Sequence, residues 1–299
     1  MDQRVAYFCG EWIPDERLCL PVDDLGFSVG ATIVERLRTF GGQVFRLTDH
    51  MHRLQRSLEI VGWNSESLTS KIEAAVRDYP VRNADCLADG DDWAIVAFVT
   101  PGRTPTAERP TVCVHGFPLL FHQFAEHFRS GLEAVIVDVR QVPSNCWPAE
   151  LKCRSRIHYY MADREAAAKS PGARAILLDQ DGLVGEATTA NVIAYFADEG
   201  LVTPPRDKVL PGVSQQVLFE IADELKIPHS ERDITPAELA SADEAYLTST
   251  SICVLPIVRL DGQPIGKGHP GQTYKRLLSA WSDLVGLDIV TQAEKFSRR

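Results

Sequence analysis

The order of strand and helix patterns along the chain restricts its fold more than any other feature. Continuous or alternating apolar residues predict strands at AIVAFVT (94–100), TVCVHGFPLLF (111–121) and EAVIVDVRQV (133–142). Apolar residues at helical spacing predict helices at TDHMHRLQRSLEIVGW (48–63) and SQQVLFEIADELKI (214–227). Strands outnumber helices and do not alternate with them regularly, which argues against a doubly wound parallel sheet. We therefore expect an α+β fold.

Turn and capping residues set the boundaries of several elements. Thr48 or Asp49 is the expected cap of the first long helix, and Pro80 is expected to end a second helix at 66–79. Gly41–Gly42 and Asp181–Gly182 predict hairpin turns. A last helix is expected over GQTYKRLLSAWSDLVG, residues 271–286.

The length of 299 residues permits two domains. The pattern changes after His127, where strand-rich sequence begins. We predict a small N-terminal domain over residues 1–120, a linker over 121–132, and a larger domain over 133–299.

Charge and cysteine content exclude several functional classes. A formal net charge of −10 argues against nucleic-acid binding, which needs clustered cations. The seven cysteines include no CxxC pair and no spacing typical of a metal site, so we expect free thiols in a reducing, cytoplasmic environment. No stretch approaches the ~20 apolar residues of a membrane span. We thus expect neither a nucleic-acid nor a membrane partner.

The segment GKGHPG at 266–271 matches a dinucleotide-binding string but not its context. That motif needs a preceding strand and a helix that begins inside it. Here a DGQP turn precedes the segment and Pro270 interrupts it, so we interpret it as a loop.

Four segments of the C-terminal half carry chemically useful groups. ELKCRSRIHYY contains Lys152, one of 8 lysines in the chain, and a guanidinium cannot replace a nucleophilic amine. GEATTAN contains the carboxylate Glu186, VLPGVSQQ places Gly212 at a helix start that can bind an anion, and LTSTS ends a strand with hydroxyls. Taken singly, each has an ordinary explanation: a solvated lysine, a hairpin carboxylate, a helix cap, a polar strand end.

Taken together, the order and spacing of these segments resemble the class IV pyridoxal-phosphate (PLP) aminotransferases. The N-terminal segment DDLGFSVGATIVERLRTFGGQVFRLTDHMHRL is also similar to the pattern of that family. The resemblance runs from about residue 5 to 285. It implies fold type IV, with a small N-terminal α/β domain and a larger β-rich domain flanked by helices. Branched-chain aminotransferases, D-amino-acid transaminases and aminodeoxychorismate lyases belong to the family.

The resemblance implies a role for each matching residue. Lys152 would form the Schiff base with the cofactor, with a pKa lowered by burial and neighbouring charge, and would move the substrate proton. Glu186 would pair with the pyridine nitrogen, and Arg53 would bind the phosphate. The other implied cofactor-binding residues are Thr189, Asn191, Gly212, Val213, Ser214, Ser249 and Thr250.

Substrate contacts are less well specified. Glu35 and Arg38 fall on the family's small-domain strand that faces the active site, with simple strand packing as the alternative. Arg103 lies two residues from the position at which D-amino-acid enzymes have a carboxylate-binding arginine. Ile157 stands where branched-chain enzymes have a tyrosine. Tyr159 and Tyr160 receive no role beyond helix packing.

The expected function is amino transfer between an α-amino acid, of branched-chain or other apolar L type, and a keto acid such as 2-oxoglutarate. No metal is expected, and the family implies a homodimer. Aminodeoxychorismate lyase and D-amino-acid transaminase are the alternatives within the family. A non-catalytic ligand-binding protein of the same fold is the alternative outside enzymes.

Overall fold

The computed structural model describes residues 3–298, which form two compact units. The first unit runs to Leu120 and includes the short segment Glu150–Ser155, whereas the second contains Phe121–Ala149 and the chain from Arg156 onward. Lys152 therefore lies in the first unit, although the boundaries expected from sequence place it in the larger domain. The reason is local, because Glu150–Ser155 pairs with a strand of the first unit, as described below.

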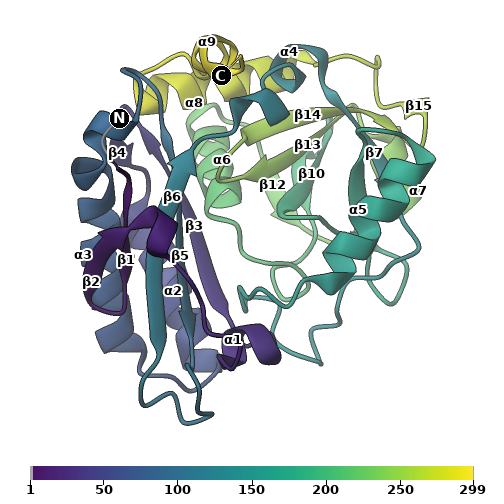
Figure 1. Cartoon of the computed structure of the whole chain (residues 1–299). Helices are drawn as coiled ribbons and strands as arrows, with labels where there is room; N and C mark the ends of the chain where they lie inside the picture. Colours follow the sequence, from purple (N-terminus) through teal and green to yellow (C-terminus); the bar gives the residue numbers. More distant parts are fainter. Residues whose placement is uncertain (1–2, 299) are drawn as a thin grey trace. The chain divides into compact units, whose positions relative to one another are not determined.

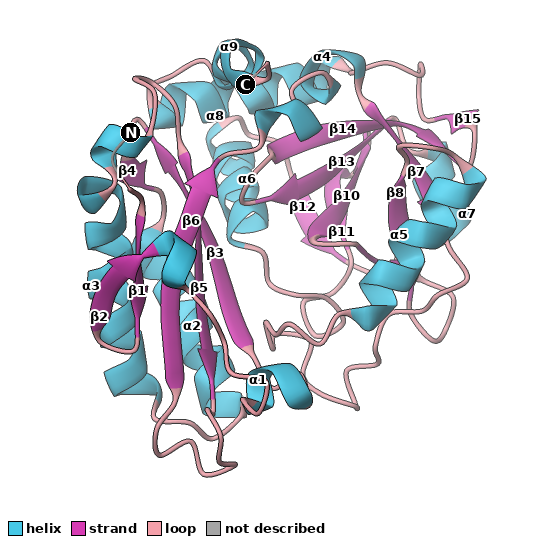
Figure 2. Ribbon diagram, viewed as in Figure 1, coloured by secondary structure: helices cyan, strands magenta, loops and turns pink. Residues whose placement is uncertain are grey.

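The first unit is an antiparallel six-stranded sheet with helices on one face (Figures 1 and 2). The order of strands in the sheet is β2-β1-β6-β5-β3-β4. The strands are β1 (Val5–Phe8), β2 (Glu11–Pro14), β3 (Ile33–Phe40), β4 (Gln43–Val44), β5 (Trp93–Thr100) and β6 (Thr111–Pro118). The helices are α1 (Leu25–Ser28), α2 (Leu47–Ile60) and α3 (Ser65–Arg82), with short 3-10 turns η1 (Asp15–Arg17) and η2 (Ala84–Cys86).

The core of this unit lies between the sheet and helices α2 and α3. Ile33 and Leu37 alternate along β3 toward the helices and pack with Leu54 and Ile72, all four nearly inaccessible to water. Glu35 lies between them in the same alternation, so this strand directs one carboxylate into the apolar layer.

Two helix boundaries predicted from sequence are wrong. Helix α2 is not capped by Thr48 or Asp49, because it begins at Leu47 after Arg46, whose φ of 51° is left-handed. Asp49 instead forms an ion pair with Arg46 at 3.5 Å. Helix α3 continues through Pro80 to Arg82: the proline removes one helical hydrogen bond, and its ring is buried in the core.

The second unit is a mixed sheet whose pairing closes on itself (Figure 2). Strand β10 (Ala190–Phe196) pairs with β13 (Glu244–Ser249), and the path continues through β14 (Cys253–Leu260), β7 (Leu132–Ile136) and β8 (Arg174–Leu178). Strand β9 (Val184–Ala187) then pairs with both β8 and β10, which completes the ring. The remaining strands are β11 (Gly200–Thr203), β12 (His229–Glu231) and β15 (Gln263–Pro264).

Helices flank this sheet. Helix α5 packs against β7 and β8 through Ala162 and Ala166, which are fully buried. The helices are α4 (His127–Ser130), α5 (Ile157–Lys169), α6 (Val213–Glu224), α7 (Pro236–Ser241), α8 (Gln272–Val285) and α9 (Ile289–Phe296), with the 3-10 turn η3 (Phe121–Gln123) before α4. The helix predicted at 271–286 is thus present, but it is followed by α9, which the sequence reasoning missed. Strand β7 ends at Ile136, well before the expected residue 142.

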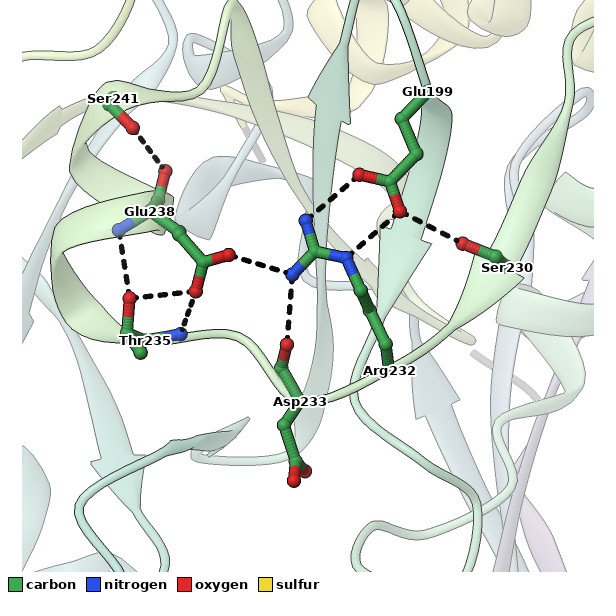
Figure 3. A network of polar contacts seen from close by, with 7 residues as sticks. All are labelled: Glu199, Ser230, Arg232, Asp233, Thr235, Glu238 and Ser241. Carbon is green, nitrogen blue, oxygen red and sulfur yellow. Dashed lines mark hydrogen bonds and ion pairs between the residues drawn. The ribbon is translucent and has the colours of Figure 1, made fainter.

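A polar network at the surface joins the turn after β10, strand β12 and helix α7 (Figure 3). The Arg232 guanidinium donates to both oxygens of Glu199 at 2.9 Å and to Glu238 at 2.9 Å. Glu238 also completes a capping box with Thr235 at the start of α7. One arginine therefore connects the turn after β10 to the helix that follows β12.

These two units confirm the expected α+β class. Within residues 3–298, no helix is both long and apolar enough to cross a membrane.

Candidate active site

The segment that contains Lys152 is fixed to the edge of β3 in the first unit. Val34 N–H donates to the Lys152 carbonyl at 3.1 Å, and Arg154 N–H donates to Thr32 O at 2.9 Å. Between these bonds, Ile33 and Cys153 form an antiparallel bridge. The Lys152 N–H donates to the hydroxyl of buried Ser57 on α2 at 3.2 Å. The lysine thus stands on backbone that is held from a strand and from a helix.

A buried cluster of Glu35, His50 and Arg53 lies between β3 and α2. Arg53 Nε donates to Glu35 Oε2 at 3.0 Å, and Arg53 Nη2 donates to Oε1 at 2.6 Å. His50 Nδ1 donates to Glu35 Oε1 at 3.0 Å, because an ionised carboxylate can only accept. Glu35 is 0 % exposed and its arginine partner is nearly buried. This bidentate pairing fixes the guanidinium plane of Arg53.

The charges in this cluster shift two pKa values. Burial alone would raise the pKa of Glu35, but the charge of Arg53 and the hydrogen bonds from His50 and Arg53 outweigh burial and lower that pKa far below its usual 4.5. Burial lowers the pKa of His50. Together with the positive charges of Arg53 and Lys152, it outweighs the hydrogen bond to Glu35 and the negative charge of Glu35, which raise that pKa. Glu35 is therefore ionised and His50 neutral at pH 7.

The other two cations predicted for substrate binding lie in different surroundings. Arg38 is 1 % exposed, pairs with buried Asp92 at 3.3 Å, and lies 3.8 Å from the centre of the Phe40 ring. These contacts are those of simple strand packing, the alternative considered for Arg38. Arg103 is at the surface, where its Nε is 3.0 Å from Asp23.

In the second unit, Glu186 on β9 is a buried carboxylate that accepts from two neutral donors. The Tyr159 hydroxyl of α5 donates to Glu186 Oε2 at 3.1 Å, and the Leu210 N–H donates to Oε1. Glu186 is 4 % exposed. Both donors favour the ionised form of the carboxylate.

Glu186 belongs to a row of polar side chains across three strands. Asn191 on β10 is its cross-strand partner, and Thr248 on β13 is the partner of Asn191. Direct cross-strand partners lie on the same face of a sheet, so the three side chains share one face. Asn191 Nδ2 donates to Leu210 O at 2.8 Å, which fixes Leu210 through both of its backbone groups. Among residues 3–298, the buried Thr248 hydroxyl makes no hydrogen bond.

Gly212 is required by the close approach of this row to the next segment. A Cβ built at Gly212 would lie 2.1 Å from Asn191 Oδ1, so any larger residue would displace the amide. Gly212 is also the N-cap of α6, whose first residues are Val213 and Ser214. The first N–H groups of a helix have no intrahelical partner, which makes this a seat for an anion.

The remaining predicted cofactor residues occupy turns of the second unit. Thr189 connects β9 to β10 with a left-handed φ of 66°. Ser249 ends β13 and Thr250 begins the turn to β14, both half-buried. The structure therefore brings Glu35 together with Arg53, and Glu186 together with Asn191 and Gly212.

Sequence reasoning assigned no role in the site to three contributors, Tyr159, Leu210 and His50, whereas Thr248 belongs to the LTSTS hydroxyls singled out above. Tyr159 lies seven residues from the lysine and outside any known spacing, whereas Leu210 acts through its backbone and leaves no sequence signal. His50 could have been found, because it precedes Arg53 by three residues on one helix face.

Comparison with known proteins agrees with this fold. The family model for amino-transferase class IV matches residues 32–260, which cover both units. The chain therefore belongs to the class IV aminotransferases, and it is an enzyme of fold type IV. The resemblance seen in the sequence is confirmed.

Individual relatives are distant and of two kinds. The D-alanine aminotransferase of Bacillus licheniformis is 25 % identical over 284 residues, which cover 91 % of this chain and 94 % of the relative. The branched-chain-amino-acid aminotransferase of Escherichia coli K12 is 26 % identical over 284 residues, which cover 93 % of this chain and 92 % of the relative. A solved structure of the Escherichia coli branched-chain aminotransferase has a TM-score of 0.83 at 23 % identity, over 95 % of this chain and 95 % of that one.

Proposed function

We propose that this chain is a PLP-dependent aminotransferase that moves an amino group between an α-amino acid and a 2-keto acid. The observation that carries the proposal is the buried carboxylate Glu186, which accepts from two neutral donors in the second unit. A carboxylate of this kind suits a protonated pyridine nitrogen, and class IV aminotransferases use PLP.

The side chains present fit the three parts of PLP. Lys152 supplies the amine for the aldehyde, and Glu186 supplies the carboxylate for the ring nitrogen. Arg53 would bind the phosphate with a guanidinium whose plane is already fixed by Glu35. The amides of Val213 and Ser214 and the hydroxyls of Ser249 and Thr250 would complete the phosphate site.

One feature of the second unit supports this fit independently of the family. The Thr248 hydroxyl is buried without a partner within residues 3–298. A buried hydroxyl without a partner costs free energy, and a bound ligand can offset that cost. When bound, PLP supplies an electron sink that stabilises negative charge at the substrate α-carbon.

The residues of the chain would then carry the proton transfer. The Lys152 amine would take the α-proton of the substrate and later give up a proton, while its backbone position is held by Val34 and Ser57. His50 is neutral and so adds no further positive charge beside Arg53. Because the amino acid would give up its amino group before the keto acid receives it, we expect ping-pong kinetics.

For the amino donor we propose a branched-chain or other apolar L-amino acid, with 2-oxoglutarate as acceptor. The support is the likeness to solved branched-chain enzymes, including one from Thermoproteus uzoniensis with norvaline at 25 % identity and a TM-score of 0.80. The D-alanine aminotransferases, at similar identity, make D-amino acids the competing class.

The test is a half-reaction screen of the PLP-loaded protein with L- and D-amino acids, followed by absorbance. Lys152→Ala and Lys152→Arg should both abolish borohydride-trapped cofactor and turnover, because neither side chain offers a nucleophilic amine. Normal transamination by either variant would refute the proposal. Pyruvate release from aminodeoxychorismate without any keto acid would assign the site to the lyases instead.

A further inference from the structure

Tyr159 is a residue that the proposed reaction does not yet use, although it touches the carboxylate at its centre. Its hydroxyl donates to Glu186 Oε2 at 3.1 Å, whereas the neighbouring Tyr160 is 60 % exposed. The two tyrosines therefore differ in environment despite being adjacent on α5.

The ring of Tyr159 is held from several sides. It packs against the apolar cluster formed by α5, β7 and β8, which includes Val135 and Ala162. His158 lies 4.2 Å from it between ring centres, and the Arg156 guanidinium lies 5.9 Å from the centre of the ring. A tyrosine has few rotatable bonds, so a fixed ring also fixes the position of its oxygen.

The hydroxyl remains a donor at all ordinary pH values. Burial raises the pKa of Tyr159, and the negative charge of Glu186 raises it further, while a hydrogen bond from the Gln141 side chain acts in the opposite direction. The net effect is a pKa well above that of a free tyrosine. Since Glu186 can only accept when ionised, the proton of this bond lies on Tyr159.

We propose that Tyr159 is a positioning residue for cofactor chemistry: its hydroxyl holds the Glu186 carboxylate ionised and correctly oriented toward the pyridine nitrogen of PLP. The inference rests on the proposed function. Leu210 N–H holds one carboxylate oxygen and Tyr159 holds the other, so rotation of the carboxylate would break one of the two bonds. A carboxylate that keeps both donors is a weaker competitor for the pyridinium proton, so the proton stays on the ring.

The experiment compares Tyr159→Phe with Tyr160→Phe in the full chain. Both variants lose one hydroxyl from the same turn of α5, but Tyr159 alone of the pair contacts Glu186. The measurements are the PLP dissociation constant, the ¹⁵N chemical shift of PLP labelled at the ring nitrogen, and the melting temperature without cofactor.

For Tyr159→Phe we expect about 10-fold weaker PLP binding, the size of one hydrogen bond to a charged group. The ¹⁵N signal should move toward that of an unprotonated pyridine. Tyr160→Phe should match the wild type in both measurements. If Tyr159 only stabilised the fold, Tyr159→Phe would lower the melting temperature without moving the ¹⁵N signal. That result would overturn the inference.

A second variant keeps the hydroxyl and the fold. Incorporation of 3-fluorotyrosine at position 159 makes the hydroxyl a stronger donor, so the ¹⁵N signal should move toward the protonated form. An unchanged ¹⁵N signal in both Tyr159→Phe and the 3-fluorotyrosine variant would overturn the role of Tyr159. Cofactor trapping on Lys152 in the wild type would in that case leave the proposed function intact. Failure of the wild type to bind PLP would instead refute the proposed function and, with it, this inference.

Discussion

Glu35 and Glu186 are both buried carboxylates on strands, but their partners differ. Glu35 in the first unit faces the guanidinium of Arg53 and the ring of His50. Glu186 in the second unit accepts hydrogen bonds from a tyrosine hydroxyl and a backbone N–H. The first carboxylate neutralises a cation of the protein itself. The donors to the second are neutral, so neither of them cancels its negative charge.

Burial alone does not mark a carboxylate as functional. A buried charge that is paired with an opposite charge of the protein contributes mainly to structure and orientation. A buried carboxylate whose two oxygens are oriented by hydrogen bonds, as in Glu186, can face a positively charged ligand group in a defined direction. Substitution of the two residues should therefore affect different quantities.

The largest effect on stability is expected for Glu35→Gln. This change removes the negative charge that the nearly buried Arg53 guanidinium faces, for which a loss of about 3–5 kcal/mol in unfolding free energy is typical. Urea denaturation of the cofactor-free protein measures it. A loss below about 1 kcal/mol would mean that the cluster is more hydrated than its burial indicates.

Glu186→Gln should reduce activity more than stability. Activity should fall about 100-fold, the usual cost of removing one electrostatic contact to a reacting group. Unfolding free energy without cofactor should change by less than about 2 kcal/mol, because the amide oxygen can still accept one bond. Steady-state kinetics and denaturation of the same sample separate the two effects. Equal losses of stability in both variants would remove the distinction between the carboxylates.

Acid should destabilise the first cluster. The folded-state pKa of Glu35 lies below its usual 4.5, so its contribution is present above that pH and is lost as pH falls. The pKa of His50 is also lowered from 6.5, so the unfolded state binds its proton first and stability falls below about pH 6.5. Unfolding free energy should decrease from pH 7 to pH 4, and Glu35→Gln should flatten the lower part of that curve. If unfolding free energy depended on pH in the same way in Glu35→Gln as in the wild type, the lowered pKa would not belong to Glu35.

Gly212→Ala should disturb the Glu186 row by a smaller amount. The new Cβ would push on Asn191 Oδ1 and weaken the bond from Asn191 to Leu210, for a cost of about 1–3 kcal/mol. Thermal unfolding with and without PLP measures it. The double variant Gly212→Ala with Asn191→Ala should recover part of the loss, and strictly additive losses would show that the collision is relieved elsewhere.

The smallest effect is expected at the surface network around Arg232. Glu199→Ala removes two hydrogen bonds to a guanidinium that keeps Glu238, and exposed ion pairs contribute less than about 1 kcal/mol. The melting temperature in low and high salt checks this, since screening should shrink the difference. A larger loss would place Arg232 among the structural ion pairs, beside Glu35.

The sequence predicted the class of fold because hydrophobic periodicity reports burial directly. It placed β5, β6, α6 and α8 close to where they lie. It misjudged local ends that depend on packing: α2 begins after a left-handed Arg46, and α3 includes Pro80, which is itself buried. It also missed α9, although the buried residues Ile289, Ala293 and Phe296 recur at helical spacing.

Some residues of the candidate site could be predicted from the sequence and others could not. Lys152, Glu186 and Arg53 were found because side-chain chemistry at fixed spacing can be read from sequence. Leu210 could not be found, since a backbone N–H is common to almost every residue. Tyr159 could not be assigned because its partner is distant in sequence and close only after β9 pairs with β8. Side chains that bind are visible in a sequence, whereas those that orient other side chains require the fold.

The pairing of Glu150–Ser155 with β3 has a consequence for how the protein can be divided. The chain passes between its two units three times, after Leu120, after Ala149 and after Ser155. A single cut at any one passage leaves the units joined through the other two. Lys152 falls in the first unit and Glu186 in the second, so a fragment that begins at Arg156 keeps Glu186 and loses Lys152. Separate expression of the two units as uninterrupted fragments should therefore yield no fragment with both groups.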